Sequence, residues 1–506
     1  MHHLEERHAC PPAWRGSGVD GGRRSGRLLA ILALLVFAAL TWQLVPHGIG
    51  LSWRECDTQA IARNFLVDDF DPLRPRVDWR GTTDGAVECE FPLYQLATAA
   101  VMAAVGHGET VGRLLALLAT LAAGFSLYRL LELRNGSVGA IAGLLTFLTC
   151  GSTVLIATRV MPDAFSLALS VASVTTYLRF LGTGSRSALW LSMAALMFGG
   201  LQKPLALQFG WVLFGWTCLL APRRLRDPQL WLGFAAVVGA VAAWLWHGHH
   251  LHQETGLTFG VLAEGDSKFP ALAHLLSPKI HAQLGWTSVQ HGFSALGLMA
   301  AAALVLRRRM DLTDAVLLGS VVAGLYLSLR YSYHHRMGPH YHMFAAVCGA
   351  WFVARLFARG APRWAWLALA VGVAAQGSWR LATEARDRAG MTENPMLELA
   401  ADIRGVTSTD ELIVVRSEKR RVDDLWQRRN NFEDPRLLYQ AQLRGWVLPA
   451  DGFDVAALER LRRQGAALVY DWAGDSAGAT RDWLQANGRV VIDRPGARLY
   501  RLFTEN

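Results

Sequence analysis

The sequence predicts a polytopic α-helical membrane protein with about eleven spans and a small α/β domain at its C-terminal end. Hydrophobic residues make up 52% of the 506 residues and charged residues only 18%, whereas soluble domains usually contain about 25% charged residues. Long apolar runs alternate with short Arg-rich segments, and the net charge is +9. This charge fits orientation in a membrane better than nucleic-acid binding. Six cysteines are too few for a disulfide scaffold.

The apolar runs define the expected spans. A polar tail, residues 1–27, precedes the first run at about 28–45, and no clean cleavage site follows. We therefore expect an uncleaved first span with a cytoplasmic N-terminus. A span needs roughly 17–25 residues, and several runs are at the short end. The other runs lie near 110–131, 137–157, 163–181, 187–201, 204–221, 229–247, 292–306, 313–330, 339–357 and 363–380. Together, residues 28–381 form the expected transmembrane domain.

Arginines in every second loop set the expected orientation. The positive-inside rule places these loops in the cytoplasm and the C-terminus outside. The first outer loop, 46–109, is the exception, because it holds several arginines among many acids, and we interpret it as a functional loop. The cytoplasmic groups are Arg129 and Arg134; Arg179 and Arg186; Arg223, Arg224 and Arg226; Arg307, Arg308 and Arg309; Arg355, Arg359 and Arg363.

From residue 382 the composition changes to that of a small α/β domain, 382–506. It contains no GxGxxG, P-loop or zinc spacing, so we interpret it as a docking or lid module on the outer side. Alternating strands and helices are expected in it. The strand segments are 411–416, 466–470 and 489–493, and the helical segments are 395–404, 434–444, 454–464 and 479–487.

The first outer loop holds the most informative polar residues. Its segment 53–66 suits an amphipathic helix at the membrane interface, with Asp57 near its start, where free helix amides stabilise a carboxylate. Glu88 and Glu90 lead into an apolar helix at about 92–105 that is too short to span. This arrangement would make Glu90 face the site of Asp57. Simple helix capping is the alternative interpretation for these acids.

A third acid and two cations are expected on the same outer face. Asp163 follows Pro162 at the start of the fourth span, and an acid so close to hydrocarbon is a functional candidate, with capping again the alternative. Lys203 joins the fifth and sixth spans, and Arg336 lies in a segment rich in His and Tyr. Such cations bind phosphate, although they also snorkel or bind lipid headgroups. The histidines lack a metal-binding helix spacing, so no cofactor is certain and a divalent metal stays open.

Acids and cations at one outer face suit the transfer of a sugar from a lipid phosphate to a polar acceptor. The leaving phosphate is already stable, and it needs cations that hold its developing negative charge. A carboxylate must take the proton of the acceptor hydroxyl, a step that typically contributes about 10²–10⁴-fold.

These motifs resemble the GT-C membrane glycosyltransferases, and especially the protein O-mannosyltransferase and lipid A aminoarabinose transferase group with its glycosyltransferase family 39 homologues. The similarity covers roughly 28–380 and lies in an Asp after the first span, an acid before Pro-Leu-Tyr, and Met-Pro-Asp opening the fourth span. It implies catalytic Asp57, Glu90 and Asp163, with Asp57 as the base. Donor-phosphate contacts are expected from Lys203, Arg336 and Arg159. Substrate contacts are expected from Glu55, Glu88, Tyr94, Tyr333, His335, His340 and Tyr341.

The resemblance also implies a polyprenyl-phosphate-linked sugar donor, inversion at the anomeric carbon, and a bacterial inner-membrane location with a periplasmic active site and C-terminal domain. The acceptor stays open among a lipid, a glycan and a protein. Glu90 stands where the aminoarabinose branch carries Lys, which argues against that sugar. A polytopic lipid or glycan transporter is one alternative, but transporters favour charges at the bilayer midplane. A non-catalytic membrane scaffold is the other, and the presence of Asp57 and Asp163 argues against it.

Two cysteines stand beside the acids of the first outer loop. Cys56 precedes Asp57 and Cys89 precedes Glu90. If the acids converge, the two thiols are candidates for a disulfide, because the outer face is oxidising. Two unrelated cysteines are the other interpretation.

Overall fold

The computed structural model describes residues 20–44, 51–106, 108–262, 270–333, 338–358, 360–392, 395–423, 428–429, 432–472 and 478–503. The chain divides into two compact units. Unit 1 comprises Met1–His47, Gly112–Trp244 and Ser267–Asp387, and unit 2 comprises Gly48–Val111, Leu245–Asp266 and Arg388–Asn506. Most of the predicted first outer loop therefore folds with most of the C-terminal segment, while the boundaries set from the sequence stay predictions.

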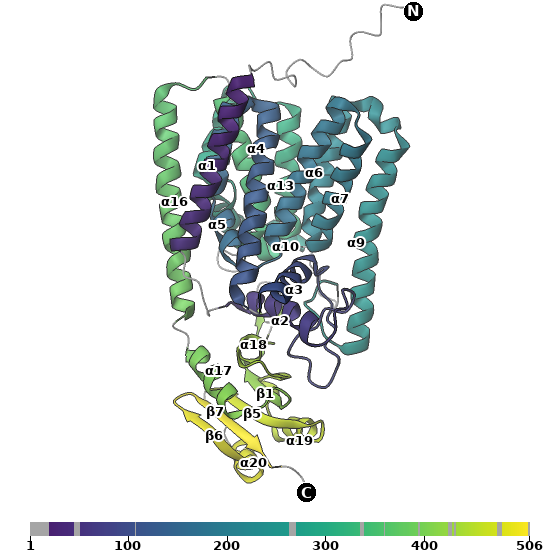
Figure 1. Ribbon diagram of the computed structural model, residues 1–506, viewed down its shortest axis with the longest axis vertical. Coiled ribbons are helices and arrows are strands. Elements are labelled where there is room, and N and C mark those ends of the chain that lie inside the picture. Colours follow the sequence, from purple (N-terminus) through teal and green to yellow (C-terminus); the bar gives the residue numbers. More distant parts are fainter. Residues whose placement is uncertain are drawn as a thin grey trace, which may run out of the picture. The chain divides into compact units, whose positions relative to one another are not determined.

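Unit 1 is a bundle of helices (Figure 1). Helix α6 packs along α7, α12 along α15, and α8 along α13. The ends of α4, α9 and α16 extend into unit 2. The helices are α1 (Asp20–Leu44), α4 (Glu109–Leu148), α5 (Gly151–Thr158), α6 (Asp163–Thr183), α7 (Arg186–Gln202), α8 (Gln208–Leu220), α9 (Pro228–Thr255), α10 (Leu272–Leu275), α11 (Pro278–Thr287), α12 (Ser294–Leu306), α13 (Leu312–Leu327), α14 (Leu329–Ser332), α15 (Met343–Phe357) and α16 (Arg363–Thr392).

In the described part of the chain, 4 helices are long and apolar enough to cross a membrane, by length and composition: Arg23–Gln43, Thr110–Leu148, Asp163–Thr183 and Pro228–Thr255. The count becomes 5 if Pro278–Gly292 and Ser294–Leu306, which are bent by 105°, form one span. Shorter apolar helices cover Leu93–Val105, Pro204–Leu220 and Leu312–Leu327. The prediction of several apolar helices is confirmed, whereas the number of eleven spans and their orientation stay predictions.

Two helices of unit 1 differ from the predicted runs. The runs at 110–131 and 137–157 meet within α4 at Gly136, whose φ of 74° and ψ of 169° interrupt the helix, a conformation that glycine adopts without a Cβ penalty. Helix α16 continues beyond the predicted apolar run at 363–380, to Thr392. Its polar last turns do not end the helix, since Glu384 and Arg388 are buried and form ion pairs.

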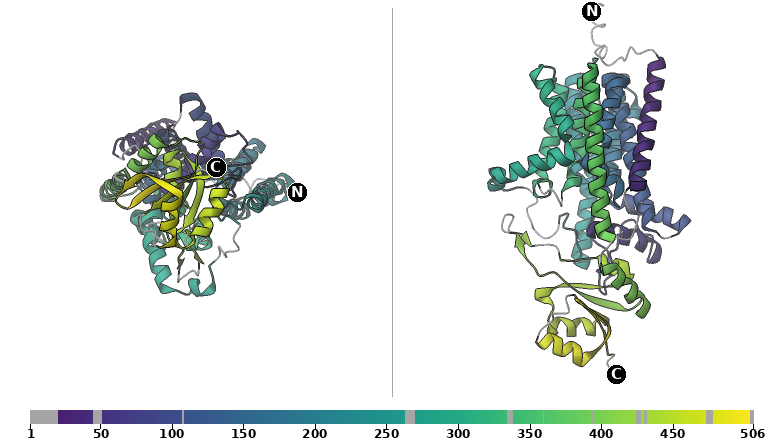
Figure 2. Two further views of the ribbon diagram at one scale, coloured as in Figure 1. Left: turned by 90° about the horizontal axis from the view of Figure 1, so that it is seen from below. Right: turned by 90° about the vertical axis from the view of Figure 1, so that its left-hand side faces the viewer.

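Unit 2 combines two helices of the first outer loop with an α/β domain, whose strands and helices are coloured from green to yellow (Figure 2). Its 5-stranded sheet has the order β4-β1-β5-β7-β6. Strand β1 is parallel to β4 and β5, and β7 is antiparallel to β5 and β6. The helices are α2 (Trp53–Val67), α3 (Leu93–Val105), α17 (Pro395–Val406), α18 (Arg436–Ala441), α19 (Val455–Arg463) and α20 (Ala479–Asn487). The strands are β1 (Leu412–Ser417), β4 (Arg444–Pro449), β5 (Ala466–Trp472), β6 (Gly488–Arg494) and β7 (Ala497–Leu502), and β2 (Val422–Asp423) pairs with β3 (Arg428–Arg429).

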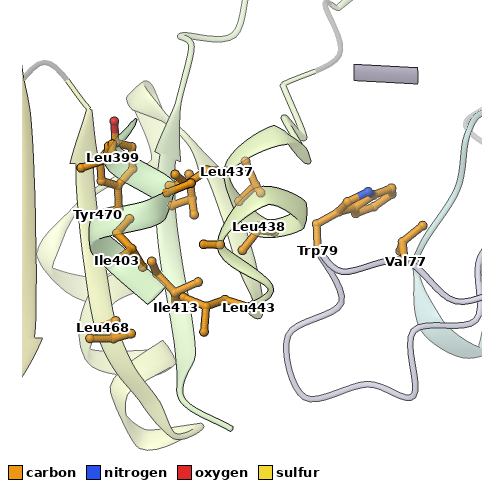
Figure 3. Packing of buried hydrophobic residues seen from close by; sticks show 14 of the residues in the cluster. Val77, Trp79, Leu399, Ile403, Ile413, Leu437, Leu438, Leu443, Leu468 and Tyr470 are labelled. Atoms are coloured by element: carbon orange, nitrogen blue, oxygen red, sulfur yellow. The ribbon is translucent and has the colours of Figure 1, made fainter. Parts of the chain in front are cut away.

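The alternation of side chains along a strand places apolar residues on both faces of this sheet. On one face, Ile413 packs with residues of α17 and α18, and the same cluster continues beyond α18 to Trp79 and Val77 of the first outer loop (Figure 3). On the other face, Val414 packs with α19 and α20. The predicted small C-terminal sheet is thus confirmed. Strand β4 was missed because the predicted helix 434–444 ends earlier, at Gln442, whose φ is 56°. Strand β7 was missed as well.

Glycines join the first outer loop to the edge strand β4. The Gly81 amide donates to the Gly445 carbonyl at 2.7 Å, and the Gly445 amide donates to the Asp78 carbonyl at 3.1 Å. A Cβ on Gly445 would lie 1.8 Å from the carbonyl oxygen of Ile413 in β1. The backbones of β1, β4 and this loop therefore approach closely only because residue 445 has no side chain.

We expect Gly445→Ala to lower the free energy of unfolding of unit 2 by about 1–3 kcal/mol, because the backbone must shift to admit the methyl group. The unfolding midpoint of the purified protein in detergent measures the effect. The control is Gly405→Ala in α17, where a Cβ would meet nothing within 4 Å and alanine favours a helix. Equal midpoints for the two variants would contradict the prediction.

Candidate functional site

Helix α2 carries Asp57 in its second turn. A capping box starts the helix, in which the amide and hydroxyl of Ser52 donate to Glu55 Oε2 at 3.1 and 2.9 Å. Residues 55–62 are all buried, so α2 differs from the amphipathic surface helix that was predicted. The reason is that apolar and polar side chains alike have protein partners around this helix. Asp57 is therefore held in a protein environment on a rigid element.

Asp57 is 9% exposed, and its carboxyl group accepts a hydrogen bond from an aromatic side chain. Trp79 Nε1 donates to Asp57 Oδ1 at 3.0 Å. Burial raises the pKa of Asp57 to about 8, and the charges of Asp78 and Asp434 act in the same direction. The Trp79 hydrogen bond and the positive charge of Arg54 oppose this rise in the pKa. A carboxylate with such a pKa is a stronger base than an ordinary aspartate and titrates near physiological pH.

Glu90 is joined to the same helix by an ion pair. Arg54 Nη2 lies 2.8 Å from Glu90 Oε2, and both side chains are partly exposed. Arg54 precedes Asp57 by three residues, so the two side chains share one side of α2. The Arg54 guanidinium also lies 5.2 Å from the ring centroid of Phe259. The sequence correctly predicted the helix that follows Glu90, which is α3.

Glu55 and Glu88 were predicted to contact substrate, and both are buried in contact with protein groups. Glu55 forms an ion pair with Arg388. Glu88 accepts hydrogen bonds from the Thr258 hydroxyl and the Leu262 amide. These contacts anchor the end of α16, from Arg388 on, and the segment after α9 within unit 2. The predicted Tyr94 is also fully buried, in the first turn of α3.

The loop that carries Trp79 is fixed to α2 by Asp78. Arg63 Nη2 lies 2.6 Å from both carboxylate oxygens of Asp78, and Asn64 Nδ2 donates to Oδ1 at 3.0 Å. Asp78 and Trp79 were not singled out from the sequence. Their signal was a tryptophan between an acid and an arginine in a loop otherwise rich in charges.

A second group of predicted residues lies within unit 1. Asp163 is the first residue of α6 and Lys203 follows α7; the two side chains are buried and form an ion pair. Lys203 Nζ also lies 4.3 Å from the centroid of the Tyr341 ring, within cation–π range. The ring of His340 is 4.5 Å from that of Tyr341. The structure thus brings these four predicted residues together.

Arg159 has a partner that the sequence did not reveal. Its Nε and Nη2 donate to the two carboxylate oxygens of Glu384 at 2.8 and 3.0 Å, and the Thr158 hydroxyl donates to the same carboxylate at 3.1 Å. The sequence signal for this partner was that Glu384 lies four residues before Arg388, at the end of an apolar run. Tyr333 is buried, and its carbonyl accepts a hydrogen bond from Thr287. His335 and Arg336 lie outside the described residues.

The predicted residues therefore form two groups, one in each unit. Unit 2 holds Glu55, Asp57, Glu88, Glu90 and Tyr94, and unit 1 holds Arg159, Asp163, Lys203, Tyr333, His340 and Tyr341. Among the residues that the structure describes, no group of three or more His, Cys, Asp or Glu is arranged to hold a metal ion.

The hypothesis of a disulfide between Cys56 and Cys89 was wrong, because the structure joins neither of these buried cysteines in a disulfide. The Cys56 Sγ lies 3.9 Å from the Leu51 carbonyl oxygen, and Cys89 packs in the apolar core of unit 2. Burial raises the pKa of the Cys89 thiol well above its ordinary value.

Comparisons with known proteins agree with the resemblance predicted from the sequence. Residues 90–247 match the model of a family described as dolichyl-phosphate-mannose-protein mannosyltransferase. A search of curated proteins found no significant match.

Similar solved structures share the fold. ArnT from Cupriavidus metallidurans in the apo state has a TM-score of 0.59 at 15% identity, covering 93% of this chain and 97% of that chain. The same protein bound to undecaprenyl phosphate gives 0.57 at 15% identity, covering 94% and 97%. Arabinofuranosyltransferase AftD from Mycobacteria gives 0.56 at 13% identity, covering 95% of this chain and 40% of that chain. The chain thus has the fold of these solved structures.

Proposed function

We propose that this chain, which has the GT-C glycosyltransferase fold, transfers a sugar from a polyprenyl-phosphate donor to a lipid, glycan or protein acceptor at the periplasmic face of a bacterial inner membrane. The observation that carries the proposal is the buried carboxyl of Asp57, whose pKa is about 8. A general base is most effective when its pKa lies near the operating pH. The family match and the undecaprenyl phosphate in the ArnT structure support a lipid-phosphate donor.

In the proposed reaction the acceptor hydroxyl gives its proton to Asp57. The acceptor oxygen forms a bond to the anomeric carbon of the sugar, and the bond between that carbon and the phosphate oxygen breaks. The lipid phosphate leaves with the electron pair of that bond. Inversion at the anomeric carbon is the expected stereochemical result of this single displacement.

The other predicted residues take supporting roles in this proposal. Lys203 holds the phosphate, and the carboxylate of Asp163 positions its ammonium group. Glu90 orients Arg54 next to the base. Arg159 is held by Glu384, which favours a structural role over direct phosphate binding, and Arg336 is proposed as a second phosphate contact.

The direct test is sugar transfer by the purified protein in liposomes. Labelled polyprenyl-phosphate sugars are the donors, and a membrane lipid extract, a glycan and a peptide are offered as acceptors. We expect a labelled product that requires both donor and acceptor. If no donor is consumed while labelled lipid crosses the bilayer only in the presence of the protein, the chain is a transporter and the proposal is wrong.

We expect Lys203→Met to weaken donor binding and lower kcat/KM by about 10–100-fold, since a hydrogen bond to a charged group contributes about 1.5–3 kcal/mol. Binding of labelled polyprenyl phosphate and the transfer assay measure the two effects. The control is Lys279→Met at an exposed position of α11.

A second variant separates donor binding from folding, because Lys203→Met alone leaves the buried Asp163 without its Lys203 partner. The double variant Lys203→Met with Asp163→Asn removes both charges and should recover stability but not donor binding. Donor binding by the double variant at the level of the wild type would show that Lys203 does not hold the phosphate.

A further inference from the structure

Trp79 of the first outer loop donates a hydrogen bond to the proposed base. Its Nε1 lies 3.0 Å from Asp57 Oδ1, and both residues are 9% exposed. A hydrogen bond to a charged acceptor is roughly twice as strong as one between neutral groups, and burial protects this one from competing water. The indole therefore engages one particular oxygen of the carboxyl group.

Both sequence neighbours of Trp79 are tied to helix α2. Asp78 is fully buried, and its Oδ2 lies 2.6 Å from Nη2 of Arg63 in α2. Arg80 is also buried, and its Nη1 lies 2.6 Å from Oδ2 of Asp68, the C-cap of α2. A buried ion pair is costly to break. The backbone on either side of Trp79 is thus held on the helix that carries the base.

The ring of Trp79 has a neighbour from a third segment. Phe259 follows α9, and its ring centroid lies 6.1 Å from that of Trp79, with an interplanar angle of 41°. The Phe259 amide donates to the Glu88 carbonyl at 2.9 Å, and the Glu88 amide donates to the Leu257 carbonyl at 3.2 Å. Phe259 also packs against the apolar core that contains Trp79. Both the backbone and the ring of Trp79 are therefore confined, which keeps Nε1 directed at Asp57.

We propose that Trp79 is a positioning residue, which holds Asp57 Oδ1 by its hydrogen bond so that Oδ2 takes the proton from the acceptor substrate. This inference rests on the proposed function. When the proton arrives, Oδ2 becomes the hydroxyl oxygen of a neutral carboxylic acid. Oδ1 becomes the carbonyl oxygen, which still accepts the hydrogen bond from Nε1. The carboxyl group keeps one orientation through the step, as a base within hydrogen-bond reach of its substrate requires.

The hydrogen bond also stabilises the charged form of Asp57, which gives the proposal a signed test. Titratable side chains from α2, the first outer loop and the segments before α18 and α3 act on the same carboxyl or interact with it: Arg54, Asp78, Asp434 and Cys89. Arg54 lowers the pKa of Asp57, whereas Asp78 and Asp434 raise it. The Cys89 thiol has a raised pKa and is neutral at physiological pH. Trp79→Phe changes none of these side chains, so a shift in the ionisation of Asp57 reports the lost N–H donor.

The experiment compares pH profiles of kcat/KM for transfer in liposomes between the wild type and Trp79→Phe, which keeps an aromatic ring. We expect the midpoint to rise by about one pH unit, the order of a lost hydrogen bond to a charged group. Above both midpoints, kcat/KM should stay about 10-fold lower, because a base that is no longer held is misplaced for part of the time. The KM for the lipid donor should not change.

A double variant separates positioning from damage to the fold. In an Asp57→Asn background, Trp79→Phe should cause no further loss of transfer, because the base through which Trp79 acts is already absent. A general defect of the loop would lower the residual transfer again and would overturn the proposal. If Trp79→Phe does not fold, the same profiles are measured with benzothienylalanine at this position, which keeps the shape of the indole and replaces its N–H by sulfur.

The matched control is Trp446→Phe, the same change in a tryptophan of β4 whose ring lies against Gly81 of the same loop. Its midpoint should coincide with that of the wild type, and an equal rise in both variants would contradict a role of the hydrogen bond to Asp57. If the wild type transfers sugar and Trp79→Phe has the same midpoint and rate, this inference is wrong while the proposed function stands. If the wild type transfers no sugar with any donor, the proposed function fails and this inference fails with it.

Discussion

Asp57→Asn is expected to lower kcat/KM for sugar transfer by about 10²–10⁴-fold, the usual contribution of a general base. The amide cannot take the acceptor proton at any pH. It can still accept the hydrogen bond that Trp79 Nε1 donates to Asp57 Oδ1 in the wild type, so the geometry of α2 should persist. Transfer in liposomes, with expression and folding checked in detergent, measures the loss.

The same variant is expected to be more stable than the wild type at alkaline pH. Burial raises the pKa of Asp57 from 3.8 to about 8, so between these values the folded state binds more protons than the unfolded state. The stability of the wild type therefore falls as pH rises from about 4 to 8, and the full penalty is present above pH 8. The penalty is at most about 6 kcal/mol, and asparagine removes it. Unfolding midpoints of the two proteins should differ at pH 8.5 and converge near pH 4.

A matched control is Asp69→Asn, because Asp69 lies in the same loop region and its side chain is 70% exposed. This variant should keep wild-type transfer and show no pH-dependent gain in stability. If Asp57→Asn keeps full transfer, the base lies elsewhere and Glu90 or Asp163 becomes the candidate. If it loses transfer but gains no stability at pH 8.5, the carboxyl is not desolvated as the structure indicates. A stability gain combined with lost activity is what a desolvated catalytic carboxyl produces.

The sequence predicted Asp57 but not the residues that determine its properties. A carboxylate near a helix start after a long apolar run is a local pattern, and so are the short helix after Glu90 and the acid that opens α6. Trp79, which donates a hydrogen bond to Asp57, lies 22 residues from it in the sequence. Asp434 lies much farther along the chain, in the C-terminal domain. Periodicity and capping report neighbours within a few positions, whereas burial and charge around a site depend on contacts far apart in the chain.

In the C-terminal domain, too, the elements with a clear local sequence pattern were predicted, and those that depend on distant contacts were missed. Strands β1 and β5 were predicted because they are largely apolar and most of their residues are buried. Strand β6 is only partly buried and was predicted from its central residues Val490, Val491 and Ile492. Strand β4 begins two residues after the left-handed Gln442, and no turn signal of Gly or Pro separates it from the preceding helix. Strand β7 contains two arginines among six residues, which obscures its buried positions. Segment β4 is a strand because it pairs with β1 at the edge of the sheet, and its composition alone does not indicate a strand.

Glu55→Gln is expected to lower the free energy of unfolding by about 3–5 kcal/mol, although the change removes only a charge. Glu55 is 0% exposed and Arg388 is 4% exposed, and the two form an ion pair. Glutamine can keep the capping box with Ser52, so the loss isolates the ion pair from the cap. Arg388→Met should cost a similar amount, because it leaves the Glu55 charge buried without its guanidinium partner. Unfolding midpoints in detergent measure both.

The double variant Glu55→Gln with Arg388→Met should be more stable than either single variant, because no buried charge then lacks its partner. The exposed pair Arg494–Asp402, with side chains 40% and 41% exposed, supplies the control. Asp402→Asn should cost no more than about 1 kcal/mol. A Glu55→Gln midpoint equal to that of Asp402→Asn would mean that the buried pair does not stabilise unit 2.

The double variant also decides between the two roles of Glu55. The sequence assigned it to substrate binding, whereas its contacts in the structure with Ser52 and Arg388 favour support of α2 two residues before Asp57. If Glu55 only supports the helix, the double variant recovers both stability and most of the transfer activity. If Glu55 contacts substrate, stability returns while kcat/KM stays low, because no change at Arg388 can replace the lost carboxylate. The ratio of recovered activity to recovered stability therefore separates a structural acid from a substrate-binding acid.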